Sequence, residues 1–265
     1  MSYLMESKGE AQRLLIKGDE PTTRHQLLLT GLKPGMRAVD AGGGAGFVSR
    51  IMADIVTASG EVLLVDQSDE RLQVAREYTA PFTHVSFVQG PLEQIPLPAD
   101  SVDYVFCRFV FEYLQNPEAV FAELVRIVRP GGKIVVGDLD YNVMTHYPLP
   151  DGIEAQLHEA LGQLARKKLF DPFAGRKLYH YFYQSNCQHI QVHFLPHHLF
   201  YGEVAEKDLF NFDMKVKQIE QLSKAGVLKL SFDVTQFAKE VRAFFRSPSR
   251  FSYTPLILVE GIKAG

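Results

Sequence analysis

A glycine-rich segment, Asp40-Ala41-Gly42-Gly43-Gly44-Ala45-Gly46, lies between a predicted strand and a predicted helix. The strand is the short run 36–40, which ends in an aspartate. In residues 45–57 the apolar side chains recur every three or four positions, which is the spacing of a helix with one buried face. Glycine lets the chain turn tightly and lets a ligand approach the backbone closely. This order indicates an open α/β sheet with a ligand site at the end of a strand.

Further strands and helices alternate along the chain. Apolar runs predict strands at 61–66, 84–88, 102–107 and 133–138. Strands and helices that alternate at this spacing form right-handed crossovers between parallel strands. We therefore predict a Rossmann-like, doubly wound and mostly parallel sheet with helices on both faces.

The helices of this region have recognisable ends. Ser68, followed by two acids, and Asn116-Pro117 are typical helix starts, because a side-chain oxygen can accept from the free backbone N–H groups there. Gly60 is expected to close the helix that follows the glycine-rich segment. Pro130-Gly131-Gly132 is expected to end the helix that starts at Asn116-Pro117.

The pattern of the C-terminal half predicts additional helices, and two more strands of the same sheet. Residues 151–186 are expected to be mostly helical, and 189–200 to form an edge strand interrupted at Pro196. Two amphipathic helices are expected within 203–247, followed by a last strand at 254–262. The two helices would form an insertion that covers the ligand-binding end of the sheet.

Composition excludes several classes of protein. The 265 residues include 22% charged residues and carry a formal net charge of −3, so no overall basic field indicates nucleic-acid binding. Two cysteines exclude a disulfide scaffold and indicate a reducing compartment. The chain has no stretch of about 18 apolar residues and no apolar signal core at its start, so we expect a soluble, cytoplasmic protein without a membrane span.

Two acids frame the ligand site. The spacing of the glycines does not give G-x-G-x-x-G, the pattern of a dinucleotide loop, but it gives D-x-G-x-G-x-G from Asp40 to Gly46. An acid directly before the glycines disfavours a phosphate and favours a cation such as an amino acid's ammonium. Asp66, at the end of the next strand, can accept both hydroxyls of a ribose. The pair predicts a ligand that joins an amino acid to a nucleoside, and a purely structural turn is the alternative.

These motifs resemble the class I S-adenosylmethionine-dependent methyltransferases. The matching stretches are VDAGGGAGFVSRI, EVLLVDQSDERLQVAR and SVDYVFCRFVFEYLQNPEAVFAELVRIVRPGGKIVV. The resemblance covers roughly residues 6–145 and is most similar to small-molecule methyltransferases that modify quinones, sterols and secondary metabolites. It implies S-adenosyl-L-methionine as the cofactor, S-adenosyl-L-homocysteine as the product, and a small-molecule methyl acceptor as the partner.

The resemblance also implies roles for individual residues. The methionine part of the cofactor would be held by Asp40 and the backbone of Gly42, Gly43 and Gly44, with the Arg108 backbone nearby. Asp66 would hold the ribose, Gln67 would flank the adenine, and Arg13 would lie on a helix that closes over the cofactor. The family usually has Gly-Asp-Ala where this chain has Gly90-Pro91-Leu92. The acceptor for the adenine amino group is therefore missing, which costs about 1 kcal/mol of affinity, and the Leu92 N–H remains as a donor.

Candidates for the acceptor side follow the fifth predicted strand. Methyl transfer requires alignment and exclusion of water, and requires a base only if the acceptor must lose a proton. Asp140, Tyr141 and His146 are the candidate catalytic residues; alternatively, Asp140 caps a turn and Tyr141 belongs to the core. No metal site is expected, because His193, His197 and His198 lack a carboxylate or cysteine at ligand spacing.

We therefore expect a single methyltransferase domain over 1–265, with a helical segment at 1–30, a cofactor-binding core at 31–145 and the helical insertion at 203–247. The predicted activity is in-line transfer of a methyl group to a small, partly apolar molecule. A catalytically inactive cofactor-binding or interaction protein of the same fold is the alternative. A nicotinamide oxidoreductase is disfavoured by the glycine spacing. The identity of the acceptor and the oligomeric state stay open.

Overall fold

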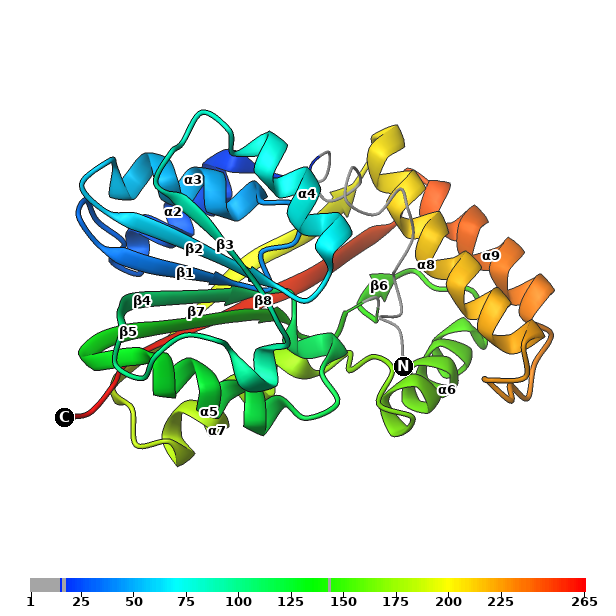
Figure 1. Cartoon of the computed structure of the whole chain (residues 1–265). Helices are drawn as coiled ribbons and strands as arrows, with labels where there is room; N and C mark the ends of the chain where they lie inside the picture. The colour runs from blue at the N-terminus through cyan, green and yellow to red at the C-terminus, as the bar shows by residue number, and fades with distance from the viewer. Residues whose placement is uncertain (1–14, 16–17, 143) are drawn as a thin grey trace.

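A mixed β-sheet organises the part of the chain that the computed structural model describes, namely residue 15, residues 18–142 and residues 144–265. Within these residues the sheet has eight strands, in the order β3-β2-β1-β4-β5-β8-β6, with β7 paired to β8 (Figure 1). Arg13 and most of the predicted segment 1–30 lie outside the described residues.

Five neighbouring strands are parallel and form the predicted doubly wound core. They are β1 (Arg37–Ala41), β2 (Glu61–Asp66), β3 (Val85–Gln89), β4 (Val102–Arg108) and β5 (Val128–Leu139). The order reverses between β1 and β4, and in such sheets ligands bind beside the carboxyl ends of the strands at the reversal. The predicted fold class is confirmed, and the glycine-rich segment lies at the reversal.

Helices cover both faces of this core. On one face lie α2 (Glu20–Leu29), α3 (Phe47–Val56) and α4 (Asp69–Tyr78); on the other lie α5 (Pro117–Ile127) and α7 (Ala174–Gln184) (Figure 1). Met52 of α3 is fully buried in one cluster with Phe106 of β4. Phe121 of α5 and Phe182 of α7 are buried in another cluster with Val105 of β4. Alternate residues of a buried strand thus fill two cores, which explains its uninterrupted apolar sequence.

The predicted helix starts are confirmed. The Ser68 hydroxyl accepts from the Arg71 N–H at 3.3 Å, and the Asn116 side chain accepts from the Ala119 N–H at 3.4 Å. The predicted helix ends are wrong. The first helix stops at Val56, and Gly60 instead allows the chain to pass close to Met36, because a Cβ there would lie 2.4 Å from the Met36 oxygen.

Pro130-Gly131-Gly132 does not end α5 either, because the segment belongs to β5. The helix stops at Ile127, and Val128 already pairs with Val102 of β4. The Gly131 N–H donates to the Lys263 oxygen at 3.0 Å. Val128 and Lys133 pair with Val102 and Tyr104 of β4, so the turn between them is an irregularity within β5.

The last two strands run antiparallel to their neighbours. β8 (Phe251–Ile262) lies between β5 and β7 (Gln188–Tyr201), so its first residues lie at the carboxyl ends of the parallel strands. The prediction of an edge strand is confirmed, because β7 pairs with β8 alone among the described strands. The predicted interruption at Pro196 is wrong: Pro196 lies opposite Pro255, and the strand continues past it. An edge strand tolerates proline because one of its sides needs no N–H donor.

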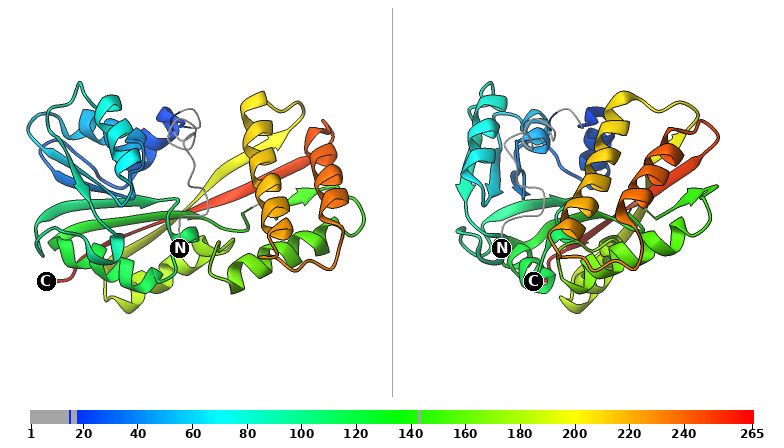
Figure 2. Two further views of the ribbon diagram at one scale, coloured as in Figure 1. Left: turned by 45° about the vertical axis from the view of Figure 1, so that its right-hand side comes forward. Right: turned by 90° about the vertical axis from the view of Figure 1, so that its right-hand side faces the viewer.

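A layer of helices extends beyond this end of the sheet. It comprises α6 (Ile153–Arg166), α8 (Glu206–Lys224) and α9 (Val234–Arg246), beside the short strand β6 (His146–Tyr147). Figure 2 shows α8 and α9 side by side, and Phe212 and Phe245 lie buried in the hydrophobic cluster of this layer. Among the described helices, none combines the length and apolar character needed to cross a membrane.

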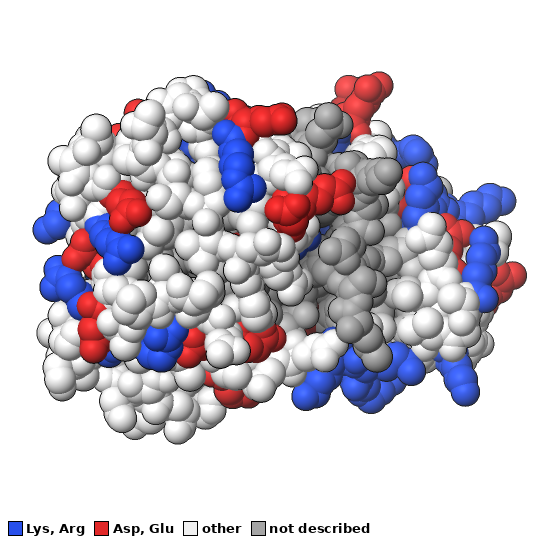
Figure 3. All heavy atoms as spheres, in the orientation of Figure 1, with Lys and Arg blue, Asp and Glu red and all other residues white. Residues whose placement is uncertain are grey.

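Charged side chains are unevenly spread over the surface. In Figure 3, positive and negative side chains are interspersed over the sheet layer, while a group of Lys and Arg side chains lies at the end formed by α6, α8 and α9.

Close packing of α7 on β5 gives a test of the fold. A Cβ at Gly175 would lie 2.8 Å from the Asp138 backbone oxygen, so Gly175→Ala should lower the free energy of unfolding by about 1–3 kcal/mol. At Gly162 of α6, a Cβ would meet only the flexible end of Arg166 at 3.4 Å. Gly162→Ala should therefore raise the free energy of unfolding by about 0.5–1 kcal/mol. Denaturant titration measures both, and equal effects would contradict the packing described here.

Candidate functional site

The glycine-rich segment turns sharply at the end of β1. The N–H groups of Gly42 and Gly43 donate to the Val65 oxygen at 2.8 and 3.2 Å, which ties the turn to β2. Gly42 and Gly44 have φ of +75° and +55°, a region that L side chains rarely adopt. A Cβ at Gly42 would lie 2.7 Å from a methyl group of Val110. Glycine is therefore required on steric grounds, and the loop presents backbone rather than side chains.

Asp40 lies beneath this loop. Its side chain is buried, and its Oδ2 accepts from the Ser49 hydroxyl at 2.6 Å. A Cβ at Gly43 would lie 2.8 Å from the same oxygen. Burial raises the pKa of Asp40 to about 6, against the opposing effects of the Ser49 hydrogen bond and the Arg108 charge. The Asp40 carboxylate therefore lies close against the backbone of the loop at Gly43. Its contact with a ligand's ammonium stays a prediction.

Asp66 joins the loop to the start of α4. Its Oδ2 accepts from the Gly44 N–H at 3.0 Å, and its Oδ1 accepts from the Ser68 N–H at 2.9 Å. The Arg71 guanidinium also donates to Oδ1, through Nε at 3.1 Å and Nη2 at 2.8 Å. A carboxylate has about four acceptor positions, so the buried Oδ2, with one donor among the described residues, can accept one further hydrogen bond. The predicted role of Asp66 in holding a ribose stays a prediction.

The predicted adenine-side residues lie beside Asp66. The Gly90 N–H donates to the Asp66 backbone oxygen at 3.1 Å. Leu92 begins the short helix η1 (Leu92–Gln94), and its Cδ1 lies 3.6 Å from the Cβ position of Gly42. Gln67 is exposed directly after β2. The structure therefore brings Gln67 and Leu92 to the same strand ends as Asp66, as the sequence predicts.

Arg108 has a structural role that the sequence did not reveal. Its buried guanidinium donates to the Gln26 side chain at 2.5 Å and to the Thr23 hydroxyl at 3.1 Å. Burial lowers the pKa of Arg108 to about 10, and the Asp40 carboxylate counteracts this shift. Arg108 therefore fastens α2 to the end of β4 and supplies the positive charge that faces Asp40.

The three candidate catalytic residues are not brought together. Asp140 binds Arg176 of α7 through both its oxygens, at 2.7 and 2.9 Å. Tyr141 is 38% exposed, and its ring packs edge-on against Phe173 beside the same guanidinium. His146 lies elsewhere, at a pocket of the helical layer, where its Nδ1 is 2.8 Å from the Ser252 hydroxyl. Their catalytic roles stay predictions, and the ion pair of Asp140 favours its structural alternative.

A buried polar chain links β5 to the helical layer. The Glu112 N–H, in the short helix η2 (Phe111–Tyr113), donates to the Asp138 carboxyl at 3.0 Å. Asn142 donates from its side chain to Glu112 at 2.8 Å and accepts from the Lys215 ammonium at 3.1 Å. Burial, and then the Glu112 charge, raise the pKa of Asp138 well above its ordinary range.

Sequence reasoning missed Glu112, Asn142 and Lys215. The available signals were an acid within the apolar run 109–114 and a lysine among the apolar positions of 206–224. Neither signal shows that the two residues share a partner, because that depends on the fold. The polar chain ends at the pocket, since Asn142 and Lys215 both line it.

This pocket lies between the start of β8, β6, β7, α8 and α9. It encloses about 40 Å³. Residues of its lining include Asn142, His146, Phe200, Lys215, Phe245 and Ser252. The first residues of β8 and the loop after β5 lie at the carboxyl ends of the parallel strands, the same end of the sheet as the glycine loop.

Known proteins resemble the chain most over its sheet core. A family profile described as "Methyltransferase domain" matches residues 39–136. The ubiquinone/menaquinone biosynthesis C-methyltransferase UbiE of Ectopseudomonas mendocina (strain ymp) is 34% identical over 116 residues, which are 43% of this chain and 45% of that protein. The chain thus spans about half the length of the curated relatives that it matches.

Solved structures show the same fold over nearly the whole chain. A SAM-dependent methyltransferase from Aquifex aeolicus has a TM-score of 0.54 at 16% identity, covering 97% of this chain and 100% of that one. The phosphoethanolamine N-methyltransferase 2 of Haemonchus contortus, in complex with phosphomonomethylethanolamine and S-adenosylhomocysteine, has a TM-score of 0.62 at 16% identity. That match covers 98% of this chain and 58% of the nematode chain.

The buried Asp40 predicts a specific pH dependence of stability. With a pKa of about 6, against an ordinary value of 3.8, the folded state holds the proton more tightly than the unfolded state. The ionised carboxylate therefore lowers stability above about pH 6, and this loss is relieved as the pH falls towards 4. The free energy of unfolding of the wild type, relative to that of Asp40→Asn, should rise by up to about 3 kcal/mol as the pH falls from about 7 to about 4. Denaturant titration of both proteins measures the difference, and parallel pH curves would exclude the shift.

Proposed function

We propose that the chain is a class I S-adenosylmethionine-dependent methyltransferase, as the profile match over residues 39–136 supports, and that it transfers a methyl group from that cofactor to a small, partly apolar acceptor. The observation that carries the proposal is the loop of left-handed glycines closed by Asp66. When bound, the cofactor supplies a methyl group on a positively charged sulfur, which makes the methyl carbon electrophilic.

The residues present fit such a cofactor. The glycine loop offers backbone where a side chain would collide with Val110, and Asp66 Oδ2 has one donor and can accept another. Asp40 and Asp66 both lie buried at strand ends, so negative charge faces the place where a cation is expected. We assign the ribose to Asp66, the adenine side to Gln67 and Leu92, and the methionine side to Gly42, Gly43 and Gly44.

The acceptor side is proposed at the pocket of the helical layer. His146 is the predicted catalytic residue that lines it, beside apolar rings that suit a partly apolar molecule. Alignment and exclusion of water are what the chain itself must contribute to a displacement at the methyl carbon.

A cytoplasmic location is part of the proposal, supported by two cysteines, Cys107 and Cys187, that form no disulfide.

Binding of S-adenosylhomocysteine tests the cofactor site. Asp66→Asn keeps the shape of the side chain but removes the charge that attracts hydroxyl donors, so affinity should fall by about 1–3 kcal/mol. Asp69→Asn, three residues further and exposed, is the matched control and should leave affinity unchanged. Isothermal calorimetry measures both. Absence of binding to the wild type at millimolar ligand would reject the cofactor proposal.

Turnover separates an enzyme from an inactive relative of the same fold. With S-adenosylmethionine and a panel of phenols, quinols, amines and carboxylic acids, we expect a product heavier by one methylene unit, together with S-adenosylhomocysteine. Mass spectrometry detects both products. Tight cofactor binding without turnover on any member of the panel would favour the inactive, ligand-binding alternative.

A further inference from the structure

The part of the sheet that reaches the helical layer is covered by α8 and α9 on one face. This extension consists of β6, the last residues of β7 and the first residues of β8 (Figure 1). Phe200 of β7 lies opposite Ser252 of β8, and its ring packs edge-on against Phe245 of α9, with centroids 5.3 Å apart. The buried Ser252 shares that face. Because successive side chains of a strand point to opposite faces, the neighbours of Ser252 point away from the helices.

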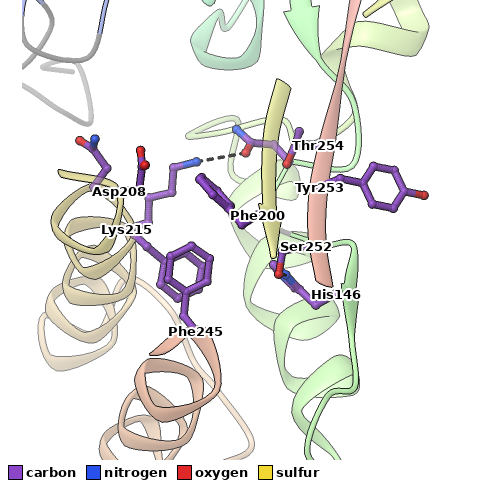
Figure 4. A pocket seen from close by; sticks show the side chains of 11 residues that line it. His146, Phe200, Asp208, Lys215, Phe245, Ser252, Tyr253 and Thr254 are labelled. Carbon is purple, nitrogen blue, oxygen red and sulfur yellow. Dashed lines mark hydrogen bonds between the residues drawn. The ribbon is translucent and has the colours of Figure 1, made fainter. Parts of the chain in front are cut away.

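The opposite face of the extension carries exposed aromatic rings. Phe251 lies opposite both Tyr147 of β6 and Tyr201 of β7, and directly opposed residues of antiparallel strands share a face. Tyr253 shares this face with Phe251, and the centroids of the two rings lie 5.8 Å apart. Figure 4 shows the Tyr253 ring on the far side of β8, pointing away from the pocket.

The same face continues along β7. Phe194 lies opposite Ile257, which follows Tyr253 by four residues in β8 and therefore shares its face. Helix α7 covers this face at Ile257, since a Cβ at Gly175 would lie 3.0 Å from the Ile257 side chain. The Phe194 ring, on the outer strand, remains exposed. We name this set of rings the aromatic row; it consists of Tyr147, Phe194, Tyr201, Phe251 and Tyr253.

The exposed area of the aromatic row is large for a single chain. The exposed fractions are 75% for Tyr147, 70% for Phe194, 68% for Tyr201, 46% for Phe251 and 41% for Tyr253. At ~200 Å² for each whole side chain, these fractions amount to about 600 Å², which is the upper end of the range for the largest apolar patch of a monomer. Two such surfaces packed together would remove about 1,200 Å² from water, which reaches the range of specific protein–protein interfaces.

The composition of these strands favours a second copy of this chain as the partner. No Lys, Arg, Asp or Glu occurs in β6, in β7 or in residues 251–255. The strands therefore offer no Lys or Arg to a nucleic-acid backbone or to anionic lipid. Three of the five rings belong to tyrosine, which is enriched at protein interfaces. A surface without charge can face its own image across a two-fold axis without like-charge repulsion.

The open edge of β7 is poorly suited to pair with another strand. Pro196 has no N–H to donate, and the pairing with β8 shifts register between Gln188 and Gln191 and between His197 and Phe200. Proline and such irregularities keep an edge strand from adding a strand of another chain. The side chains of the face, rather than the backbone of the edge, are therefore the surface available to a partner.

We propose that the aromatic row is the interface of a homodimer, in which the rows of two copies pack face to face about a two-fold axis. Burial of the rings against each other provides the hydrophobic contribution to association. No residue of the row is among those proposed for the cofactor or the acceptor. The inference is therefore independent of the proposed function.

Sedimentation velocity of the full chain at micromolar concentration tests the interface. The variants are Phe194→Lys and Tyr147→Lys, which place a charge on two different strands of the row. Phe210→Lys is the matched control, because Phe210 is 56% exposed on α8 and lies outside the row. Circular dichroism and thermal unfolding establish that each variant is folded.

We expect the wild type and Phe210→Lys to sediment as dimers. Each substitution in the row places a lysine ammonium against the partner's rings, so it should raise the dissociation constant of the dimer at least about 30-fold. Three results would overturn the proposal: a wild type that stays a single chain across the micromolar range, a dimer that survives either substitution in the row, or an equal loss in Phe210→Lys. A single-chain wild type that instead floats with vesicles of phosphatidylcholine and phosphatidylglycerol, and no longer does so as Tyr147→Lys, would also overturn it and would assign the row to a membrane surface.

Discussion

The hydrogen bond from the Gly44 N–H to the Asp66 carboxylate connects the parts of the proposed cofactor site. It closes the loop after β1 onto the end of β2, and the same carboxylate holds the start of α4 through Ser68 and Arg71. The loop therefore has a defined shape before any ligand arrives. A site that is already formed loses less conformational freedom on binding than a flexible loop would.

This end of the sheet buries charged side chains, which is unfavourable, and nearby donors and opposite charges compensate for part of that cost. Asp40 has a hydroxyl donor and a nearby guanidinium, and Asp138 is flanked by backbone N–H groups, which favour the ionised form, and by the Glu112 charge, which disfavours it. Arg108 is held by two polar side chains of α2. Each of these residues lies at the carboxyl end of a parallel strand or just beyond it. Polar chemistry is thus concentrated at one end of an otherwise apolar sheet.

Sequence patterns predicted the elements that depend on local rules. Burial on both faces made the parallel strands apolar, and the caps at Ser68 and Asn116 act within three residues. The predictions at Gly60, Pro130 and Pro196 were wrong because contacts distant in sequence decide the backbone there. Gly60 lies against Met36, the turn at Pro130-Gly131-Gly132 is bonded to Lys263, and Pro196 lies opposite Pro255. The residues proposed for the cofactor could be predicted because a single loop and two strand ends carry them. The acceptor-side pocket could not, because Asn142, Lys215 and Ser252 meet only through the antiparallel strand and the helices before it.

The attachment of the α8–α9 pair gives these helices a degree of independence from the sheet. Tyr201, the last residue of β7, lies opposite Phe251, the first residue of β8. Everything between them leaves and re-enters the sheet at two adjacent points, as in a very long hairpin loop. The pairs between β7 and β8 lie outside residues 202–250, so their register does not depend on the length of that segment. A proposed acceptor site can therefore vary in this segment while the proposed cofactor loop keeps its sequence.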